Sequence, residues 1–310
     1  MSFSIVFPGQ GSQVIGMMAE LAEQHGVVKD LFVQASDILS VDLWSMSQEG
    51  PIEALSQTQN TQPALLVAGV AAWKVWQKLG GTQPQIMAGH SLGEYTALVC
   101  AGALSFSDGV SLVRDRGRYM QEAVPEGKGG MAAILGLDDD VVRQVCRAAA
   151  EGDVLQAVNF NAPGQVVIAG TVDAIERGIL QLKEAGAKRA LPLPVSIPAH
   201  SSLMSPASER LEKRLESINM QMPSIPVLHN CNVEVAMNAD EISKNLVTQL
   251  DSPVRWVESI EKIHQQGIDN FVESGPGRVL GGMVKRIVKG VNVGCIDKPT
   301  TISELISSVS

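Results

Sequence analysis

A serine flanked by small residues stands in the segment Gly89-His90-Ser91-Leu92-Gly93. The pattern G-x-S-x-G is typical of a sharp strand-to-helix turn that exposes a serine hydroxyl, because a Cβ on either flank would collide with the backbone. A short apolar run, residues 86–88, precedes the motif, and residues 94–100 follow it as a helical stretch. Ser91 is therefore predicted to be a nucleophile at a helix N-terminus, where free N–H groups favour negative charge. The alternative is a turn without chemistry.

A serine hydroxyl is a weak nucleophile and needs a base, which one of five histidines could supply. His200 is the best candidate because it follows Pro198-Ala199 at a loop–helix junction, where an inserted unit returns to the main domain. The alternative for His200 is a surface residue that caps a helix. Of the other four, His90 is expected beside the serine but diverging from it, and His25 at a helix end. His229 is expected in a core strand and His264 on a solvated helix face.

An arginine is predicted to face the protein interior or a cleft. Ser107 resembles the cap of a helix that runs through Val124. At 100° per residue Arg116 lies on the flank of its apolar stripe, whereas Arg114 and Arg118 point towards acidic residues and solvent. A guanidinium in that position needs an anionic partner. The partner is either an internal carboxylate or the carboxylate of a substrate held bidentately, and the helix pattern leaves both open.

Composition narrows the class of protein. The 310 residues are 45% hydrophobic and 18% charged, which is typical of a globular chain with a substantial core. A net charge of −9 argues against a nucleic-acid partner, and no apolar run reaches the ~20 residues of a membrane span. Four cysteines without C-x-x-C spacing favour reduced thiols in the cytoplasm and predict no metal site. The first seven residues favour a strand over a signal peptide.

The first 124 residues alternate between strand-like and helix-like segments. Phe3–Phe7 and Ile86–Ala88 are predicted strands, and Gln62–Leu79 is a predicted helix with Pro63 near its first turn. This alternation favours a parallel sheet covered on both faces. The glycine-rich residues 9–14 do not complete G-x-G-x-x-G, so no dinucleotide loop is expected.

A smaller domain is predicted between two parts of the larger one. After the loop-like residues 125–130 the pattern becomes βαββαβ, which is typical of a ferredoxin-like unit. We therefore expect an α/β hydrolase-like core of residues 1–124 and 198–310 and an inserted ferredoxin-like domain of residues 125–197, with a site in the cleft between them. The predicted strands of the inserted domain are Met131–Leu137, Val154–Asn159, Gln165–Ala169 and Lys188–Leu193, and its predicted helices are 138–151 and Val172–Ala185. The predicted strands of the core then resume at Val227–His229, Asn270–Val272 and Val291–Gly294.

Several segments, in this order and spacing, resemble the malonyl-CoA:acyl-carrier-protein transacylases of bacterial fatty acid synthesis. The likeness runs nearly from end to end, and it implies a hydrolase-like core with an inserted ferredoxin-like domain. The segments that carry it are Phe7-Pro8-Gly9-Gln10-Gly11-Ser12-Gln13, Thr61-Gln62-Pro63-Ala64, Ala88-Gly89-His90-Ser91-Leu92-Gly93-Glu94-Tyr95, Arg116-Gly117, the residues 159–170 and Gly275-Pro276-Gly277.

The resemblance implies a two-step acyl transfer. Ser91 would take malonyl from malonyl-CoA as an acyl ester and pass it to the phosphopantetheine thiol of acyl carrier protein. His200 would act as base and then as acid, and Arg116 would pair with the malonyl carboxylate. CoA thioester is then a substrate, and no cofactor is expected. We also expect a monomer in the cytoplasm.

Three further positions take roles from the resemblance. The backbone N–H groups of Gln10 and Leu92 would hold the oxyanion, and Gln249 lies in the segment whose backbone orients the histidine. A carbonyl in that role would explain why no acid residue stands out as a third triad member. The chain departs from the family pattern at Ala199, where relatives often carry serine, and at Ser274, where a larger apolar residue is common. Neither departure removes a catalytic group.

Two other functions remain open on the residues alone. A thioesterase or esterase could use the same serine, although a neutral acyl chain would leave Arg116 unpaired. A catalytically silent subunit could instead bind the carrier protein. Carrier proteins of this pathway are acidic, so docking would need a basic patch on an acidic chain. Two clusters could supply one, although an ordinary solvated face is the alternative for each: Lys285, Arg286 and Lys289, or Lys188 and Arg189.

Overall fold

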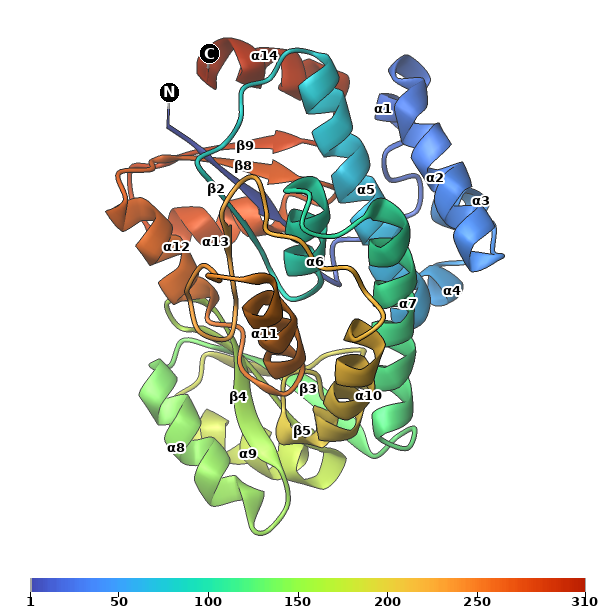
Figure 1. Cartoon of the computed structure of the whole chain (residues 1–310). Helices are drawn as coiled ribbons and strands as arrows, with labels where there is room; N and C mark the ends of the chain where they lie inside the picture. The colour runs from blue at the N-terminus through green and yellow to red at the C-terminus, as the bar shows by residue number, and fades with distance from the viewer. Residues whose placement is uncertain (1, 310) are drawn as a thin grey trace.

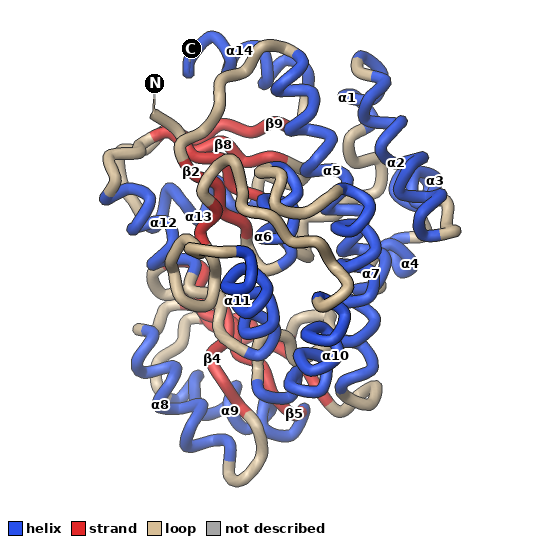
Figure 2. The backbone as a smooth tube through the Cα atoms, in the orientation of Figure 1, coloured by secondary structure: helices blue, strands red, loops and turns tan. Residues whose placement is uncertain are grey.

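The computed structural model describes residues 2–309 and contains two β-sheets with helices around both (Figures 1 and 2). The larger sheet has five strands in the order β7-β2-β1-β8-β9, and every neighbouring pair is parallel. The predicted parallel sheet is thereby confirmed. Its strands are β1 (Ser4–Phe7), β2 (Ile86–Gly89), β7 (Val227–Leu228), β8 (Asn270–Ser274) and β9 (Asn292–Ile296).

Helices cover both faces of this sheet, as β1 illustrates. Ile5 and Phe7 pack in one core cluster with α5 and α7, whereas Val6 packs on the opposite face with α12 and α13. Alternate side chains of a strand point to opposite faces, so a strand buried on both sides is apolar throughout. No helix within residues 2–309 is long and apolar enough to cross a bilayer. The helices of this large lobe are α1 (Ala19–Gln24), α2 (Gly26–Leu39), α3 (Leu43–Glu49), α4 (Ile52–Leu55), α5 (Thr58–Lys78), α6 (Leu92–Cys100), α7 (Phe106–Ala123), η1 (Ser202–Met204), α10 (Ser205–Leu215), α11 (Ala239–Asp251), α12 (Trp256–Gln265), α13 (Val279–Ile287) and α14 (Pro299–Val309).

The second sheet forms a small lobe, at the lower end of Figure 1. Its strands follow the order β4-β5-β3-β6, all pairs are antiparallel, and two helices complete a βαββαβ unit. This is the ferredoxin-like arrangement expected from the sequence. The elements lie inside residues 125–197, and the boundaries drawn there stay a prediction. They are β3 (Gly129–Leu135), α8 (Asp139–Ala150), β4 (Leu155–Ala162), β5 (Gln165–Thr171), α9 (Val172–Glu184) and β6 (Arg189–Pro192).

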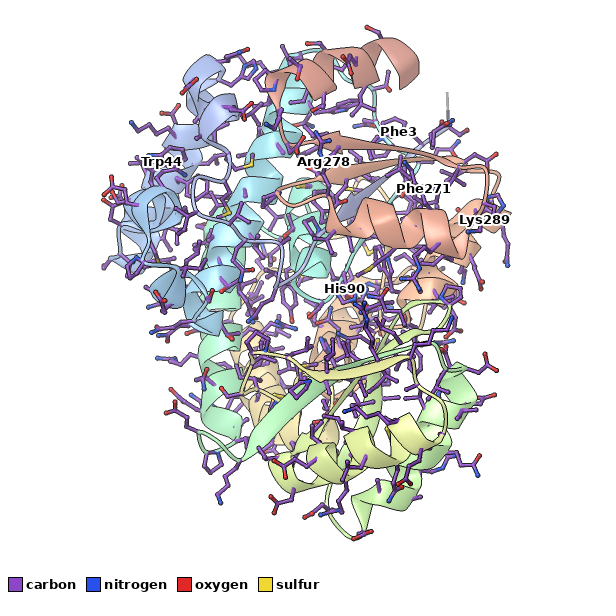
Figure 3. All side chains as sticks on the ribbon, turned by 180° about the vertical axis from the view of Figure 1, so that it is seen from behind. Phe3, Trp44, His90, Phe271, Arg278 and Lys289 are labelled. Atoms are coloured by element: carbon purple, nitrogen blue, oxygen red, sulfur yellow. The ribbon has the colours of Figure 1, made fainter. Side chains whose placement is uncertain are left out.

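Backbone hydrogen bonds join the two lobes. Val254 of the large lobe accepts from the Phe160 N–H at 3.0 Å and donates to the Val158 carbonyl at 2.8 Å, so that it continues the pairing of β4. His90 lies at the same boundary, between the large lobe and the strands of the small one (Figure 3), and its Nε2 is 2.7 Å from Asn161 Oδ1. The small lobe therefore contacts the serine-bearing loop directly.

Three local predictions were wrong. Helix α5 begins at Thr58, four residues before the expected start, and Pro63 lies inside it. Proline has no N–H to donate to the Gln59 carbonyl, and Arg114 Nη1 donates to that carbonyl instead, at 3.1 Å. Arg114 is thus half-buried against α5 and does not point to solvent. Helix α7 is capped by Ser105, whose Oγ accepts from the Asp108 N–H, and not by Ser107.

We predict that Arg114→Met lowers the free energy of unfolding by about 1–2 kcal/mol, because it removes the donor to the half-buried Gln59 carbonyl. Arg118→Met is the matched control on the same helix, since Arg118 is half-exposed and its contacts are with its neighbours Asp115 and Tyr119. It should cost about 0.5 kcal/mol or less. Urea unfolding followed by circular dichroism measures both, and equal losses would contradict the role given to Arg114.

Candidate active site

Ser91 occupies a strained turn between β2 and α6, with φ 51° and ψ −107°. A Cβ on Gly89 would lie 1.9 Å from the carbonyl carbon of Gly93, and one on Gly93 would lie 2.0 Å from the Phe7 oxygen. Neither gap can hold a carbon atom, so both flanks must be glycine. The turn therefore has the geometry that the G-x-S-x-G motif predicts.

Asn230, which the sequence analysis missed, holds this turn in place. Its Oδ1 accepts from the Ser91 N–H at 2.7 Å, and its Nδ2 donates to the Gly89 carbonyl at 2.7 Å. One side chain thus satisfies the backbone on both sides of His90. Asn230 follows β7 and is 139 positions away in the chain, so no local pattern could have indicated it.

His200 is positioned to take the proton of Ser91. Its Nε2 lies 2.8 Å from Ser91 Oγ, and its Nδ1 lies 2.8 Å from the backbone carbonyl of Gln249. A carbonyl can only accept, so Nδ1 carries the proton and Nε2 has its lone pair free towards the serine. Only 3% of His200 is exposed, and its φ of 65° is another strained backbone angle at the site.

Burial, and after it the positive charge of Arg116, lower the pKa of His200 from 6.5 to about 3. The imidazole is therefore neutral at physiological pH. Neutral imidazole is the form that accepts a proton from a hydroxyl.

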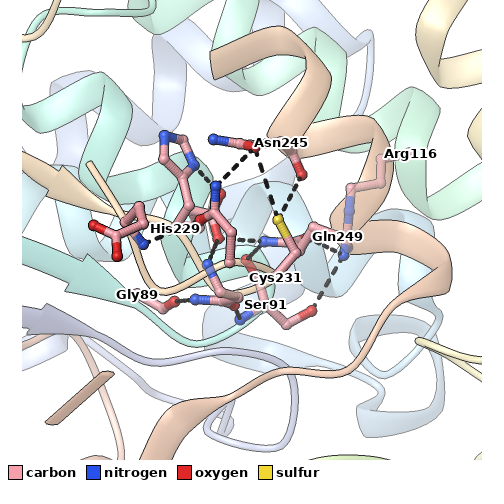
Figure 4. Close-up of polar contacts among 11 residues, drawn as sticks. Gly89, Ser91, Arg116, His229, Cys231, Asn245 and Gln249 are labelled. Atoms are coloured by element: carbon pink, nitrogen blue, oxygen red, sulfur yellow. Dashed lines mark hydrogen bonds and ion pairs between the residues drawn. The ribbon is translucent and has the colours of Figure 1, made fainter. Parts of the chain in front are cut away.

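Arg116 lies on α7 and is 1% exposed. It donates to Gln62 Oε1 at 2.9 Å. It also donates to Gln249 Oε1 at 3.1 Å and to Ser91 Oγ at 3.2 Å (Figure 4). Across residues 2–309 no carboxylate lies within ion-pair distance of it. The internal partners of this buried guanidinium are two amide oxygens, the Ser91 hydroxyl and the ring of Tyr95 at 5.1 Å, and none of them carries a full negative charge.

The two residues expected to hold an oxyanion line a cavity that Ser91 and His200 also line. The two are Gln10 and Leu92. In the described part of the chain no group accepts a hydrogen bond from the backbone N–H of either one. Two free N–H donors beside a nucleophile are what a developing oxyanion requires.

The cavity has a volume of about 330 Å³ and lies between the lobes. The small lobe contributes Met131 and Asn159, and the chain that returns from it contributes residues 193–197. Substrate bound there would contact both lobes. The large lobe contributes Gln10, Gln62, Ser91, Leu92, Arg116 and His200.

The other histidines make contacts outside the reaction centre. Nδ1 of the buried His229 is 2.7 Å from Glu94 Oε1, which confirms a satisfied core histidine. His264 lies on α12, partly exposed, with Asp269 as its ion-pair partner. His25 separates α1 from α2. Within residues 2–309 no cluster of three acidic, histidine or cysteine side chains could hold a metal.

A model of the acyl transferase domain family matches residues 4–297 of the chain. The malonyl CoA-acyl carrier protein transacylase of Escherichia coli strain K12 is 52% identical over 301 residues, which cover 97% of both sequences. The chain belongs to this transacylase family. The protein with the same description from Bacillus subtilis strain 168 is 46% identical over 307 residues, which cover 99% of the chain and 96% of that sequence. The resemblance inferred from the motifs is confirmed, and the chain is an acyltransferase.

Solved structures of transacylases match the fold of this one throughout. The malonyl CoA-acyl carrier protein transacylase of Coxiella burnetii has a TM-score of 0.98 and 48% identity, and the match covers 99% of the chain and 97% of that structure. A malonyl-transacylase solved in complex with a type II PKS acyl-carrier protein has a TM-score of 0.98 and 49% identity, with 99% and 100% covered. The two-lobed α/β fold predicted from the sequence is thereby confirmed.

We predict that the acyltransferase keeps its acylation rate from about pH 8 down to about pH 5, because His200 stays neutral until the pH approaches its lowered pKa of about 3. Rapid-mixing measurements of kcat/KM for acyl transfer to Ser91 test this. A fall centred near the ordinary imidazole pKa of 6.5 would show that His200 is not the base or is not buried as described.

Proposed function

We propose that this acyltransferase moves a malonyl group from malonyl-CoA to the phosphopantetheine thiol of acyl carrier protein through an ester on Ser91, and so supplies fatty acid synthesis. One observation carries the choice of acyl group. The buried guanidinium of Arg116 has no carboxylate partner in the described chain and lies 3.2 Å from the serine hydroxyl. A malonyl ester on that hydroxyl would bring a carboxylate to it.

In the first step His200 Nε2 takes the proton of Ser91 as Oγ attacks the thioester carbonyl carbon. The carbonyl oxygen becomes an oxyanion, which the N–H groups of Gln10 and Leu92 would stabilise. The intermediate then collapses, and the carbon–sulfur bond breaks. The CoA sulfur leaves with the proton held by His200, and malonyl remains as an ester on Ser91.

The second step runs through the same groups in reverse. His200, neutral again, takes the proton of the phosphopantetheine thiol, and the sulfur attacks the ester carbonyl. The carbon–oxygen bond to Ser91 breaks, and His200 returns the proton to Oγ. The Gln249 carbonyl holds the imidazole in one tautomer through both steps, so no acid residue is needed.

The partner surface remains a hypothesis, because one of the two predicted basic clusters is partly engaged inside the molecule. Arg286 donates to the Pro163 carbonyl of the small lobe at 3.1 Å. Lys188 and Arg189 are exposed at the start of β6. That pair is the better candidate for contact with an acidic carrier protein. The monomeric state, the cytoplasmic location and the lack of a cofactor stay predictions.

We predict that incubation with malonyl-CoA adds one malonyl mass to Ser91 and that Ser91→Ala abolishes the addition. Intact and peptide mass spectrometry measure the adduct, and holo acyl carrier protein should then remove the label and acquire it. Release of free malonate at a rate that carrier protein does not change would support the thioesterase. No adduct at all would support the silent docking subunit.

We predict that Arg116→Ala lowers kcat/KM for malonyl transfer by about a hundredfold or more while acetyl transfer changes little, because only malonyl presents a carboxylate to the guanidinium. Parallel assays with malonyl-CoA and acetyl-CoA measure the two rates. Equal losses would assign Arg116 a structural role.

A further inference from the structure

Glu94 is a buried carboxylate that the proposed reaction does not use. It is the third residue of α6, three positions after the nucleophile, and it is 0% exposed. No lysine or arginine within residues 2–309 forms an ion pair with it. Three donors converge on it instead: His229 Nδ1 at 2.7 Å, the Asn230 N–H at 2.8 Å and Gln249 Nε2 at 2.9 Å. A carboxylate with this many donors has a fixed position.

The contact with Gln249 fixes which way that amide points. Nε2 of Gln249 donates to Glu94 Oε2 and to the Ser91 carbonyl at 3.0 Å, and both are acceptors only. Its Oε1 is therefore left facing Arg116, to which it is hydrogen-bonded at 3.1 Å (Figure 4). A reversed amide would place an NH2 group against the guanidinium, donor against donor.

The orientation matters because it gives Arg116 an acceptor that carries no full charge. Amide oxygens of Gln249 and Gln62 hold two of the guanidinium nitrogens in place. A carboxylate in direct contact would hold them as well, but it would compete with a substrate carboxylate for the same charge. The side-chain amide of Gln249 thus lies between the buried carboxylate of Glu94 and the buried guanidinium of Arg116.

We propose that Glu94 is a positioning residue for acyl-group selection, which fixes the Gln249 amide so that its oxygen aims Arg116 at the substrate carboxylate. This inference rests on the proposed function, in which Arg116 binds that carboxylate. Glu94 touches no reacting atom, and it acts only through Gln249. Its hydrogen bonds, and not its charge, set the direction of the amide.

The test is the ratio of kcat/KM for malonyl-CoA to that for acetyl-CoA. Glu94→Met removes all three acceptor contacts and should lower this ratio about tenfold. Glu94→Gln should keep it within about threefold of the unaltered enzyme. Its amide oxygen can still accept from Asn230 and Gln249, and its NH2 can donate to His229 once the imidazole proton moves to the other ring nitrogen. The ratio cancels any general damage to the nucleophile turn, which slows both acyl groups alike.

Thr96→Val is the matched control, since it alters a buried side chain of the same helix that forms no hydrogen bond with the site residues within 2–309, and it should leave the ratio unchanged. If Glu94→Met does not fold, Gln249→Met takes its place, because it removes the amide and keeps the backbone carbonyl that holds His200. An unchanged ratio in these Met variants, or a loss in Glu94→Gln as large as in Glu94→Met, overturns the inference. A normal ratio in Arg116→Ala would instead overturn the proposed function.

Discussion

The hydrogen bond between His200 Nδ1 and the Gln249 carbonyl is the interaction on which the site depends. It assigns the imidazole proton to one nitrogen and leaves the other free for Ser91. Burial and the charge of Arg116 then keep the ring neutral, and among residues 2–309 no carboxylate forms an ion pair with it. A triad with a buried acid would hold the imidazolium more strongly. In the proposed reaction His200 would return readily to its neutral state, because its pKa is lowered to about 3, and it would take up and release one proton in each step.

Parts of the site that depend on local sequence could be predicted. Glycine at 89 is required by a contact only four residues along the chain, and glycine at 93 by the Phe7 carbonyl of the neighbouring strand, so the motif records both constraints although only the first is local. The apolar pattern of α7 also placed Arg116 correctly in the interior. Asn230, in contrast, belongs to the site only because β7 pairs beside β2. Such a contact depends on the order of strands in the sheet, and no spacing along the chain encodes it.

The errors in the fold have a similar origin. Pro63 argues for a helix start, because proline lacks the N–H that a helix interior uses. The helix nevertheless begins at Thr58, since Arg114 from another helix satisfies the carbonyl that the proline leaves free. The ferredoxin-like order could be predicted because its six elements are consecutive and each has its own period. The sequence of a helix does not show that a side chain from another helix will donate to its free carbonyl.

The pairing of Val254 with β4 has a mechanical consequence. The two lobes share main-chain hydrogen bonds at their seam, and His90 and Asn161 add a side-chain contact beside the nucleophile. Separating the lobes at this boundary would leave several buried polar groups without their hydrogen-bond partners. The two walls of the cavity beside Ser91 are therefore joined by main-chain hydrogen bonds, and moving the walls apart at Val254 would break those bonds.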